Sequence, residues 1–232
     1  MATKLTWLGH GTWLIESGEH TILLDPFLDD NPQAPVKSDQ VAPDYILVSH
    51  GHFDHIADAA KIAQRTGAVV VANFEICEWL KGQGVEKTHA MNIGGGFDFP
   101  FGRVKMTVAH HSSMLPDGSN GGCPCGFLLT FADGKVYFAC DTGLFHDMHL
   151  IGLSHVDVAV LPIGDNFTMG PDDALEAVKL LSPKRVIPVH VNTWPVIEAD
   201  VHAWAERVLK ETWTEPVALK PGESTTLPQE ER

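Results

Sequence analysis

The stretch V-S-H-G-H-F-D-H, residues 48–55, places three histidines and one aspartate within six positions. The apolar residues 45–48 that lead into these donors are typical of a buried strand. Neutral imidazole is the commonest nitrogen ligand of transition metals, and carboxylates bind the same ions. Four adjacent donors contribute nothing to folding and would repel one another if protonated. The stretch therefore predicts a metal site at the end of a strand.

The spacing of these donors favours two metal positions over one. Strand-like alternation directs His50 and His52 to the same side, and a turn at Asp54 and His55 directs a second pair toward a neighbouring point. A Zn²⁺ ion takes about four nitrogen, oxygen or sulfur ligands. The four local donors therefore either complete one site or begin two sites that need donors from elsewhere in the chain.

Three further donors, His111, Asp141 and His190, each follow an apolar, strand-like run later in the chain. This pattern is expected when several strands point their ends into one cleft. His110 is the alternative to His111, because strand alternation lets only one of the two point inward. The sequence thus offers enough donors to complete two metal sites at a shared cleft.

Composition and charge limit the classes of partner. The chain has 232 residues, a formal net charge of -14 and no basic run, which disfavours nucleic acid and anionic membranes. It shows neither an apolar leader nor the roughly 20 apolar residues of a membrane span, so we expect a soluble, cytoplasmic protein. The four cysteines are too few for a disulfide scaffold and are expected to be free thiols. We expect a small-molecule substrate, and a homo-oligomer is compatible with the sequence.

Two similar halves can be traced along the chain. A helix from Ile56 to a cap at Gly67 follows the first donor stretch, and a second helix begins at Pro171. Strands and a last helix are further predicted at residues 5–8, 12–15, 21–24, 68–72, 104–109, 127–131, 136–139, 158–163, 186–189, 201–208 (the helix) and 217–219. This order predicts an α/β fold, a four-layer αββα sandwich of two mixed β-sheets flanked by helices. We expect a single domain over residues 1–232.

The motif H-G-H-F-D-H, together with His111, Asp141 and His190, resembles the metallo-β-lactamase superfamily, whose fold is this αββα sandwich. The resemblance covers most of the chain. Other stretches look like the compact metal-dependent hydrolase branch, which is similar to the ascorbate-phosphate lactonases. These are T-W-L-G-H-G-T at residues 6–12, L-L-D-P-F at 23–27, H-S-S at 111–113, D-T-G-L-F at 141–145, F-T-M-G-P at 167–171 and K-P-G-E-S at 220–224.

The resemblance implies a role for each donor. It implies a first metal held by His50, His52 and His111, a second metal held by Asp54, His55 and His190, and Asp141 as the bridge between them. Histidine and carboxylate donors suit zinc, iron, manganese or nickel. The expected cofactor is therefore a pair of divalent metal ions, and the family likeness favours zinc.

Two residues outside this ligand set are also candidates for the site. Asp25, in L-L-D-P-F, matches the superfamily's first motif, which implies that it orients a ligand imidazole through the other ring nitrogen. His10 follows a strand and is a candidate catalytic residue, either as a substrate contact or as a proton donor. A structural role for His10 is the alternative.

These assignments predict an enzyme, a binuclear metal-dependent hydrolase. Two divalent ions that share a water lower its pKa to near 7, so a bridging hydroxide becomes the nucleophile. Asp54 is expected to orient this hydroxide or to pass its proton to the leaving group. Loops at residues 94–96, 116–122 and 165–170 are expected to form the substrate-binding rim.

The expected substrate is a small ester, lactone or phosphoester. Lysine and arginine are scarce near the donor motifs, which disfavours a polyanionic substrate. The alternatives are a phosphodiesterase acting on a nucleotide or lipid head group, and a non-catalytic metal-binding or sensor protein.

Overall fold

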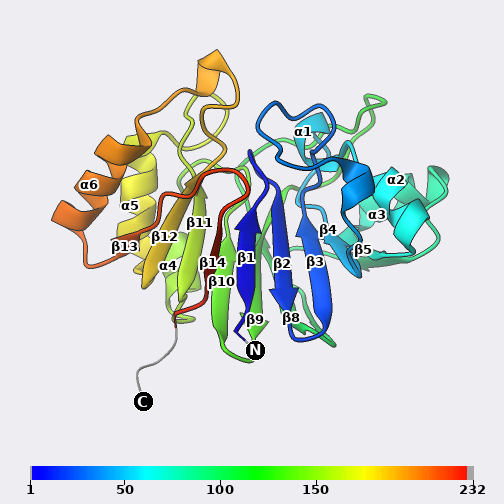
Figure 1. Cartoon of the computed structure of the whole chain (residues 1–232), viewed down its shortest axis with the longest axis horizontal. Helices are drawn as coiled ribbons and strands as arrows, with labels where there is room; N and C mark the ends of the chain where they lie inside the picture. Colours follow the sequence, from blue (N-terminus) through cyan, green and yellow to red (C-terminus); the bar gives the residue numbers. More distant parts are fainter. Residues whose placement is uncertain (1, 229–232) are drawn as a thin grey trace.

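Two seven-stranded β-sheets lie face to face, and helices cover the outer face of each sheet (Figure 1). The computed structural model describes residues 2–228. Each sheet combines a run of antiparallel strands with a run of parallel strands, so both sheets are mixed. The predicted αββα sandwich is therefore confirmed.

The first sheet has the strand order β14-β1-β2-β3-β4-β5-β6. Its strands are β1 (Lys4–Trp7), β2 (Trp13–Ser17), β3 (His20–Leu24), β4 (Tyr45–Leu47), β5 (Val69–Asn73), β6 (Thr88–Met91) and β14 (Ser224–Thr226). Pairing is antiparallel from β14 to β3 and parallel from β3 to β6. In β2, Trp13 and Ile15 are fully buried while Glu16 is exposed, as expected for a strand with one face on the core.

The second sheet has the strand order β13-β12-β11-β10-β9-β8-β7. Its strands are β7 (Gly96–Phe99), β8 (Gly102–Val108), β9 (Cys125–Phe131), β10 (Gly134–Phe138), β11 (Val158–Pro162), β12 (Arg185–Val189) and β13 (Glu215–Pro216). Pairing is antiparallel from β7 to β10 and parallel from β10 to β13. The second sheet thus repeats the plan of the first.

Helices lie on the two outer faces of the sandwich (Figure 1). They are α1 (Phe53–Ile56), α2 (Ala59–Thr66) and α3 (Phe74–Gly82) beside the first sheet, and α4 (Met148–Gly152), α5 (Pro171–Leu181) and α6 (Val201–Glu211) beside the second. Two short 3₁₀ helices occur at Ser38–Gln40 and Pro195–Ile197. As predicted, α5 begins at Pro171, and Gly67 caps α2 with a φ of 73°. The helix expected from Ile56 is divided, because α1 ends at Ile56 and α2 begins at Ala59. Within residues 2–228 no helix has the length and apolar character needed to cross a membrane.

Apolar side chains fill three layers of the sandwich: one between the two sheets and one between each sheet and its helices. Trp13, Phe127 and Phe138 are fully buried between the two sheets. A second layer packs the second sheet against α5 and α6, where the Trp204 indole N–H donates to the Pro171 carbonyl at 3.1 Å. Burial of one large apolar side chain contributes about 1.5–3 kcal/mol, so these layers hold the strand ends in fixed positions.

The edge strand β14 connects the far end of the chain to its beginning. Thr225 pairs with Leu5 of β1, and the Trp7 N–H donates to the Glu223 carbonyl at 3.1 Å. Leu227, directly after this strand, is buried in the layer between the sheets. The strand therefore covers the open side of β1 and closes one end of the core.

The sequence patterns missed the elements α3, α4, β6, β7 and β14. The strands among them are short and expose most of their side chains, so they carry little apolar alternation. Helix α3 did carry a signal, because the Asn73 side chain caps it by accepting the Ile76 N–H at 2.9 Å. The edge strand expected at residues 217–219 lies instead at Glu215–Pro216.

Candidate metal centre

The candidate residues lie where strands end. Asp25 follows β3, Asp141 follows β10 after two residues, and His190 follows β12. At these ends the chain turns through left-handed conformations, with φ of 46° at Asp25, 53° at Cys140 and 50° at His190. Such backbone costs about 1–3 kcal/mol per residue and is concentrated at functional sites, where the surrounding fold enforces it.

A first donor cluster consists of His50, His52 and His111. The Nδ1 atom of His52 lies 3.0 Å from His50 Nε2 and 3.2 Å from His111 Nε2. His110 is exposed and stacks on Phe145, so of the two neighbouring histidines it is His111 that faces the cluster. The structure thus brings together the three residues that the resemblance assigned to one metal.

The reason given for this convergence from the sequence was incorrect. Strand β4 already ends at Leu47, so His50 and His52 do not alternate along a strand. They meet because the backbone turns after Val48 and because His50 presents Nε2 while His52 presents Nδ1. The local sequence identified the donors but not the path of the backbone between them.

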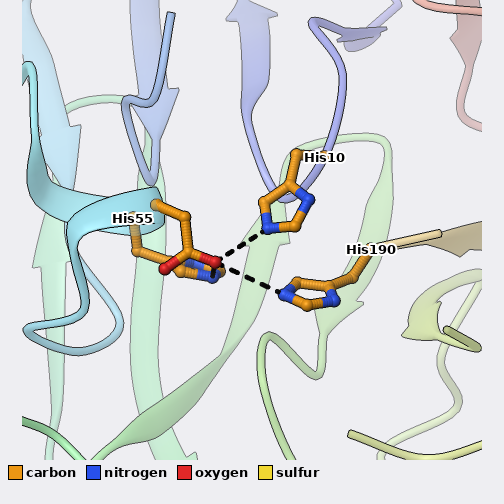
Figure 2. A group of neighbouring side chains, drawn as sticks. His10, His55 and His190 are labelled. Carbon is orange, nitrogen blue, oxygen red and sulfur yellow. Dashed lines mark hydrogen bonds and ion pairs between the residues drawn. The ribbon is translucent and has the colours of Figure 1, made fainter. Parts of the chain in front are cut away.

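A second donor cluster consists of His10, Asp54, His55 and His190. Figure 2 shows the rings of His10, His55 and His190 turned toward one another from three separate segments of the chain. The Asp54 Oδ2 atom lies 3.0 Å from His10 Nε2, 3.7 Å from His190 Nε2 and 3.8 Å from His55 Nε2. This cluster contains the three residues expected at the second metal and one that was not, His10.

The Asp141 carboxylate lies between the two clusters. Its Oδ2 atom is 3.5 Å from His111 Nε2 and 3.1 Å from His190 Nε2. Its Oδ1 atom is 3.4 Å from His55 Nε2. One buried carboxylate therefore faces imidazoles of both clusters, which is the position expected of a bridge.

Asp25 orients one imidazole of each cluster, His55 directly and His50 through Ser49. His55 donates its Nδ1–H to Asp25 Oδ2 at 2.9 Å, which leaves Nε2 as the lone-pair nitrogen on the side of Asp141. The Ser49 hydroxyl donates to Asp25 Oδ2 at 2.6 Å and accepts the Nδ1–H of His50 at 2.9 Å. His50 therefore also presents a bare Nε2 to the centre.

Burial and neighbouring charges set the protonation of the centre. Burial would lower the pKa of His190, but the carboxylates of Asp141 and Asp54 raise it to about 9. Burial would raise the pKa of Asp54, but the neighbouring His55, His10 and His190 rings hold it below its ordinary value. Burial and the adjacent His190 ring lower the pKa of His10 to about 4. The metal-free centre is thus a network of carboxylates that are ionised and of rings that compete for protons.

The donors fit a pair of metal ions. His55 Nε2 and both ring nitrogens of His190 are buried and make no hydrogen bond. An unpaired buried polar atom costs about 1–3 kcal/mol, so a ligand at these atoms is favoured. Ligands 2.0–2.2 Å from a tetrahedral zinc ion lie about 3.3–3.6 Å apart, and the spacing of 3.4 Å between His55 Nε2 and Asp141 Oδ1 agrees with this value.

A cavity of about 770 Å³ opens above the centre. Its floor is polar and includes Asp54 and Asp141. Its walls carry apolar side chains from four segments of the chain, namely Phe53, Met114, Leu115, Phe167, Trp194 and Val196. The predicted rim loops at residues 116–122 and 165–170 contribute Pro116 and Phe167.

The prediction that residues 94–96 belong to the rim is wrong, because none of them lines the cavity. The backbone hydrogen bonds explain this difference. Gly94 donates its N–H to the Met106 carbonyl at 2.9 Å, and Met106 donates to the Gly95 carbonyl at 3.0 Å. The glycine segment is therefore bound to β8 and continues the sheet.

His10 is fully buried and does not line the cavity. The interpretation of His10 as a direct substrate contact therefore disagrees with the structure. Sequence reasoning also missed the partners of its ring and backbone, Gln33 and Thr193, which are 160 positions apart. Neither residue carries a motif that would have identified it.

The chain matches known proteins over most of its length. A family model described as a beta-lactamase superfamily domain matches residues 20–191. A UPF0173 metal-dependent hydrolase of Heliobacterium modesticaldum is 48% identical over 231 residues, which is 96% of this chain and 97% of that protein. A protein of the same name from Desulforamulus reducens is 51% identical, over 95% of this chain and 98% of its own.

A solved structure extends the comparison. Igni18, described as a novel metallo hydrolase from the hyperthermophilic archaeon Ignicoccus hospitalis, is 34% identical and superposes with a TM-score of 0.89. The match covers 98% of this chain and 99% of Igni18. The chain therefore belongs to the metallo-β-lactamase superfamily, within the family of UPF0173 metal-dependent hydrolases.

Proposed function

We propose that the protein is a hydrolase that works with two divalent metal ions, and that both ions are zinc. The observation that carries the proposal is the position of Asp141, which faces both donor clusters at the floor of an open cavity. The relatives named metal-dependent hydrolases support the same class of activity. A pair of bound ions would explain why His55 Nε2 and the ring nitrogens of His190 are buried without hydrogen-bond partners.

Each cluster would hold one ion. His50, His52 and His111 would bind the first, Asp54, His55 and His190 the second, and Asp141 would bind both. When bound, the two cations would lower the pKa of a shared water to near 7 and polarise the oxygen of the scissile group. Asp25 and Ser49 keep the imidazoles in the tautomer that leaves Nε2 free for this task.

Asp54 has a second role in this proposal. It belongs to the second cluster and also lines the cavity, so one carboxylate reaches from the metal position to the substrate space. Its lowered pKa keeps it ionised, so near neutral pH it accepts hydrogen bonds and does not donate them. Asp54 would therefore orient the attacking water and receive its proton for transfer to the leaving group.

The cavity wall favours a neutral substrate with an apolar part. Phe53, Met114, Phe167 and Val196 are between 55% and 60% exposed, which is high for large apolar side chains on one rim. Among the described residues that line the cavity there is no lysine or arginine. A phosphoester would meet no cationic side chain here beside the metal ions, so we propose an ester or a lactone with an apolar chain as the substrate.

A substrate panel tests the proposal. Zinc-loaded protein would be assayed with lactones, carboxylic esters and phosphodiesters, beside Asp141→Asn as the inactive control. We expect turnover of esters or lactones and its loss in the variant. Preference for phosphodiesters would favour the alternative reaction. Equal inertness of both proteins, with zinc bound, would support a metal-binding or sensor protein without catalysis.

Variants of the rim test the substrate class. Phe167→Ser should raise KM for long-chain esters more than for short-chain esters and leave kcat nearly unchanged, because the side chain contributes uniform binding. Leu150→Ser is the matched control, since Leu150 is equally exposed but lies on α4 outside the cavity. An equal change in KM for long-chain and short-chain esters in Phe167→Ser would contradict an apolar binding wall.

A further inference from the structure

His10 is positioned by residues from three separate segments of the chain. Its Nδ1 atom lies 2.8 Å from the Thr193 hydroxyl, and its Nε2 atom lies 3.0 Å from Asp54 Oδ2. Its own backbone N–H donates to Gln33 Oε1 at 3.0 Å. The ring is fully buried and packs against the His190 ring, with 3.9 Å between the ring centroids.

The orientation of the Gln33 amide is fixed by backbone groups on both sides. Gln33 Oε1 accepts the His10 N–H, and Gln33 Nε2 donates to the Val191 carbonyl at 3.2 Å. A flipped amide would place two donors together at His10 and two acceptors together at Val191. Gln33 Oε1 is therefore an acceptor toward its remaining neighbour, Thr193.

This orientation determines where the proton of His10 lies. The Thr193 hydroxyl donates its hydrogen to Gln33 Oε1 at 3.1 Å, so its oxygen can only accept from His10. The neutral His10 ring then carries its proton on Nδ1. Its Nε2 lone pair faces the Asp54 carboxylate, and this contact of two acceptors is unfavourable unless a cation lies beside both.

His50, a ligand in the proposed function, is held by the same device. There Asp25 accepts the Ser49 hydroxyl, and the Ser49 oxygen accepts the His50 Nδ1–H. In each case an acceptor fixes a hydroxyl, the hydroxyl fixes an imidazole, and Nε2 is left bare inside the centre. The hydrogen bonds from His10 to Thr193 and from Thr193 to Gln33 thus leave His10 Nε2 free to bind a metal ion.

We infer that His10 is a fifth protein ligand of the second metal ion, beside Asp54, His55, His190 and the shared Asp141. The donor atoms of His10, Asp54, His55 and His190 all lie within 4.8 Å of one another. The spacing of 3.0 Å between His10 Nε2 and Asp54 Oδ2 fits two neighbouring ligands about 90° apart on one five-coordinate zinc ion, which lie about 2.8–3.1 Å from each other. The inference rests on the proposed two-metal site, to which it adds a residue.

Zinc titration of variants tests this assignment without an activity assay. Apo protein would be titrated with zinc against a chromophoric chelator, which yields the dissociation constants of both sites. His10→Ala should weaken one site by at least about 10-fold and leave the other unchanged. Thr193→Val, which removes the acceptor of the Nδ1–H, should weaken the same site less, and Thr193→Ser should restore it.

His110→Ala is the matched control, because His110 is an exposed histidine next to a donor yet outside both clusters. If His10→Ala retains both dissociation constants within the scatter of this control, the inference is overturned while the two-metal proposal stands. If the unmutated protein binds no zinc, the proposed function and the inference both fail.

A measurement on the unmutated protein covers the case in which His10→Ala does not fold. Protein loaded with cadmium-113 and labelled with nitrogen-15 would be studied by NMR. The inference requires scalar coupling between cadmium and the ring protons of His10 through Nε2. A proton on His10 Nε2 in the loaded protein would overturn it and would make His10 a hydrogen-bond donor to Asp54.

Discussion

The two donor clusters differ in their environment and charge. His52 and His111 of the first cluster are partly exposed at the cavity, and its three donors are all imidazoles. The second cluster is buried throughout and includes the Asp54 carboxylate. An ion in the first cluster would be balanced only by its share of Asp141. From this difference we expect the first cluster to hold an ion weakly at an accessible position and the second to hold one tightly inside the protein.

The largest expected effect comes from a residue that both clusters share. Asp25→Ala removes the acceptor of the Ser49 hydroxyl, the Ser49 N–H and the His55 Nδ1–H. Unpaired buried donors cost about 1–3 kcal/mol each, so urea unfolding should show a loss of about 3 kcal/mol or more. Zinc affinity should fall about 10- to 100-fold at both sites. Asp98→Ala, at an exposed strand position, is the control, and loss at one site alone would limit the role of Asp25 to that cluster.

Chelation should separate the clusters in time. A chelator is expected to remove the ion of the exposed cluster quickly and the ion of the buried cluster slowly, giving two kinetic phases in stopped-flow absorbance. Loss of a ligand present at 100 times its Kd removes about 2.7 kcal/mol of stability. For a chain of this size that corresponds to a fall in Tm of about 5–10 °C. Release of both ions in a single phase would contradict the expected difference in accessibility between the two clusters.

Gly11→Ala should affect the buried cluster selectively. A Cβ atom at this position would lie 2.9 Å from Cε1 of the His55 ring, so the ring must shift. We expect a destabilisation of about 1–3 kcal/mol and weaker zinc binding at one site only. Gly82→Ala is the control, because a Cβ there meets nothing within 4 Å. Weakening of both sites in the zinc titration would show that the clusters are mechanically coupled.

The smallest expected effect concerns pH and the metal-free protein. The pKa of His190 is raised from 6.5 to about 9, and that of His55 is also raised, because the nearby carboxylates outweigh burial. A raised pKa contributes stability that is complete below pH 6.5 and is lost as the pH rises toward 9. Burial lowers the pKa values of His10 and His50, so these two rings reduce the stability of the fold only below pH 6.5.

Melting curves of metal-free and zinc-loaded protein across this interval check the prediction. The Tm of the metal-free protein should decline as the pH rises. The zinc-loaded protein should show a smaller decline, because its zinc ions bind the neutral imidazoles. A rising Tm of the metal-free protein between pH 6.5 and 9 would contradict the assignment of the charged rings. The result would then favour an uncharged His190 even without metal.

The donors could be predicted from the sequence because their signal is local. His50 to His55 are contiguous, and His111, Asp141 and His190 each follow a recognisable apolar run. The alternation of helices and strands likewise indicated the sandwich. These features depend on short-range periodicity, which a single sequence preserves.

The hydrogen-bonded support of the centre could not be predicted. Gln33, Thr193 and Ser49 are ordinary polar residues, and only the fold places them behind His10 and His50. The polar edge strand β14 was missed for a related reason, because pairing across more than 200 residues leaves no local pattern. What escaped prediction in both cases depends on contacts between distant parts of the chain.

The late position of β14 has a consequence for synthesis on the ribosome. Strand β1 is among the first segments to emerge, yet the strand that covers its free edge is translated after all the others. Until then the nascent chain exposes unpaired backbone groups along β1, a template for pairing with neighbouring chains. Residues 224–226 must therefore be translated before the first sheet loses this tendency to aggregate.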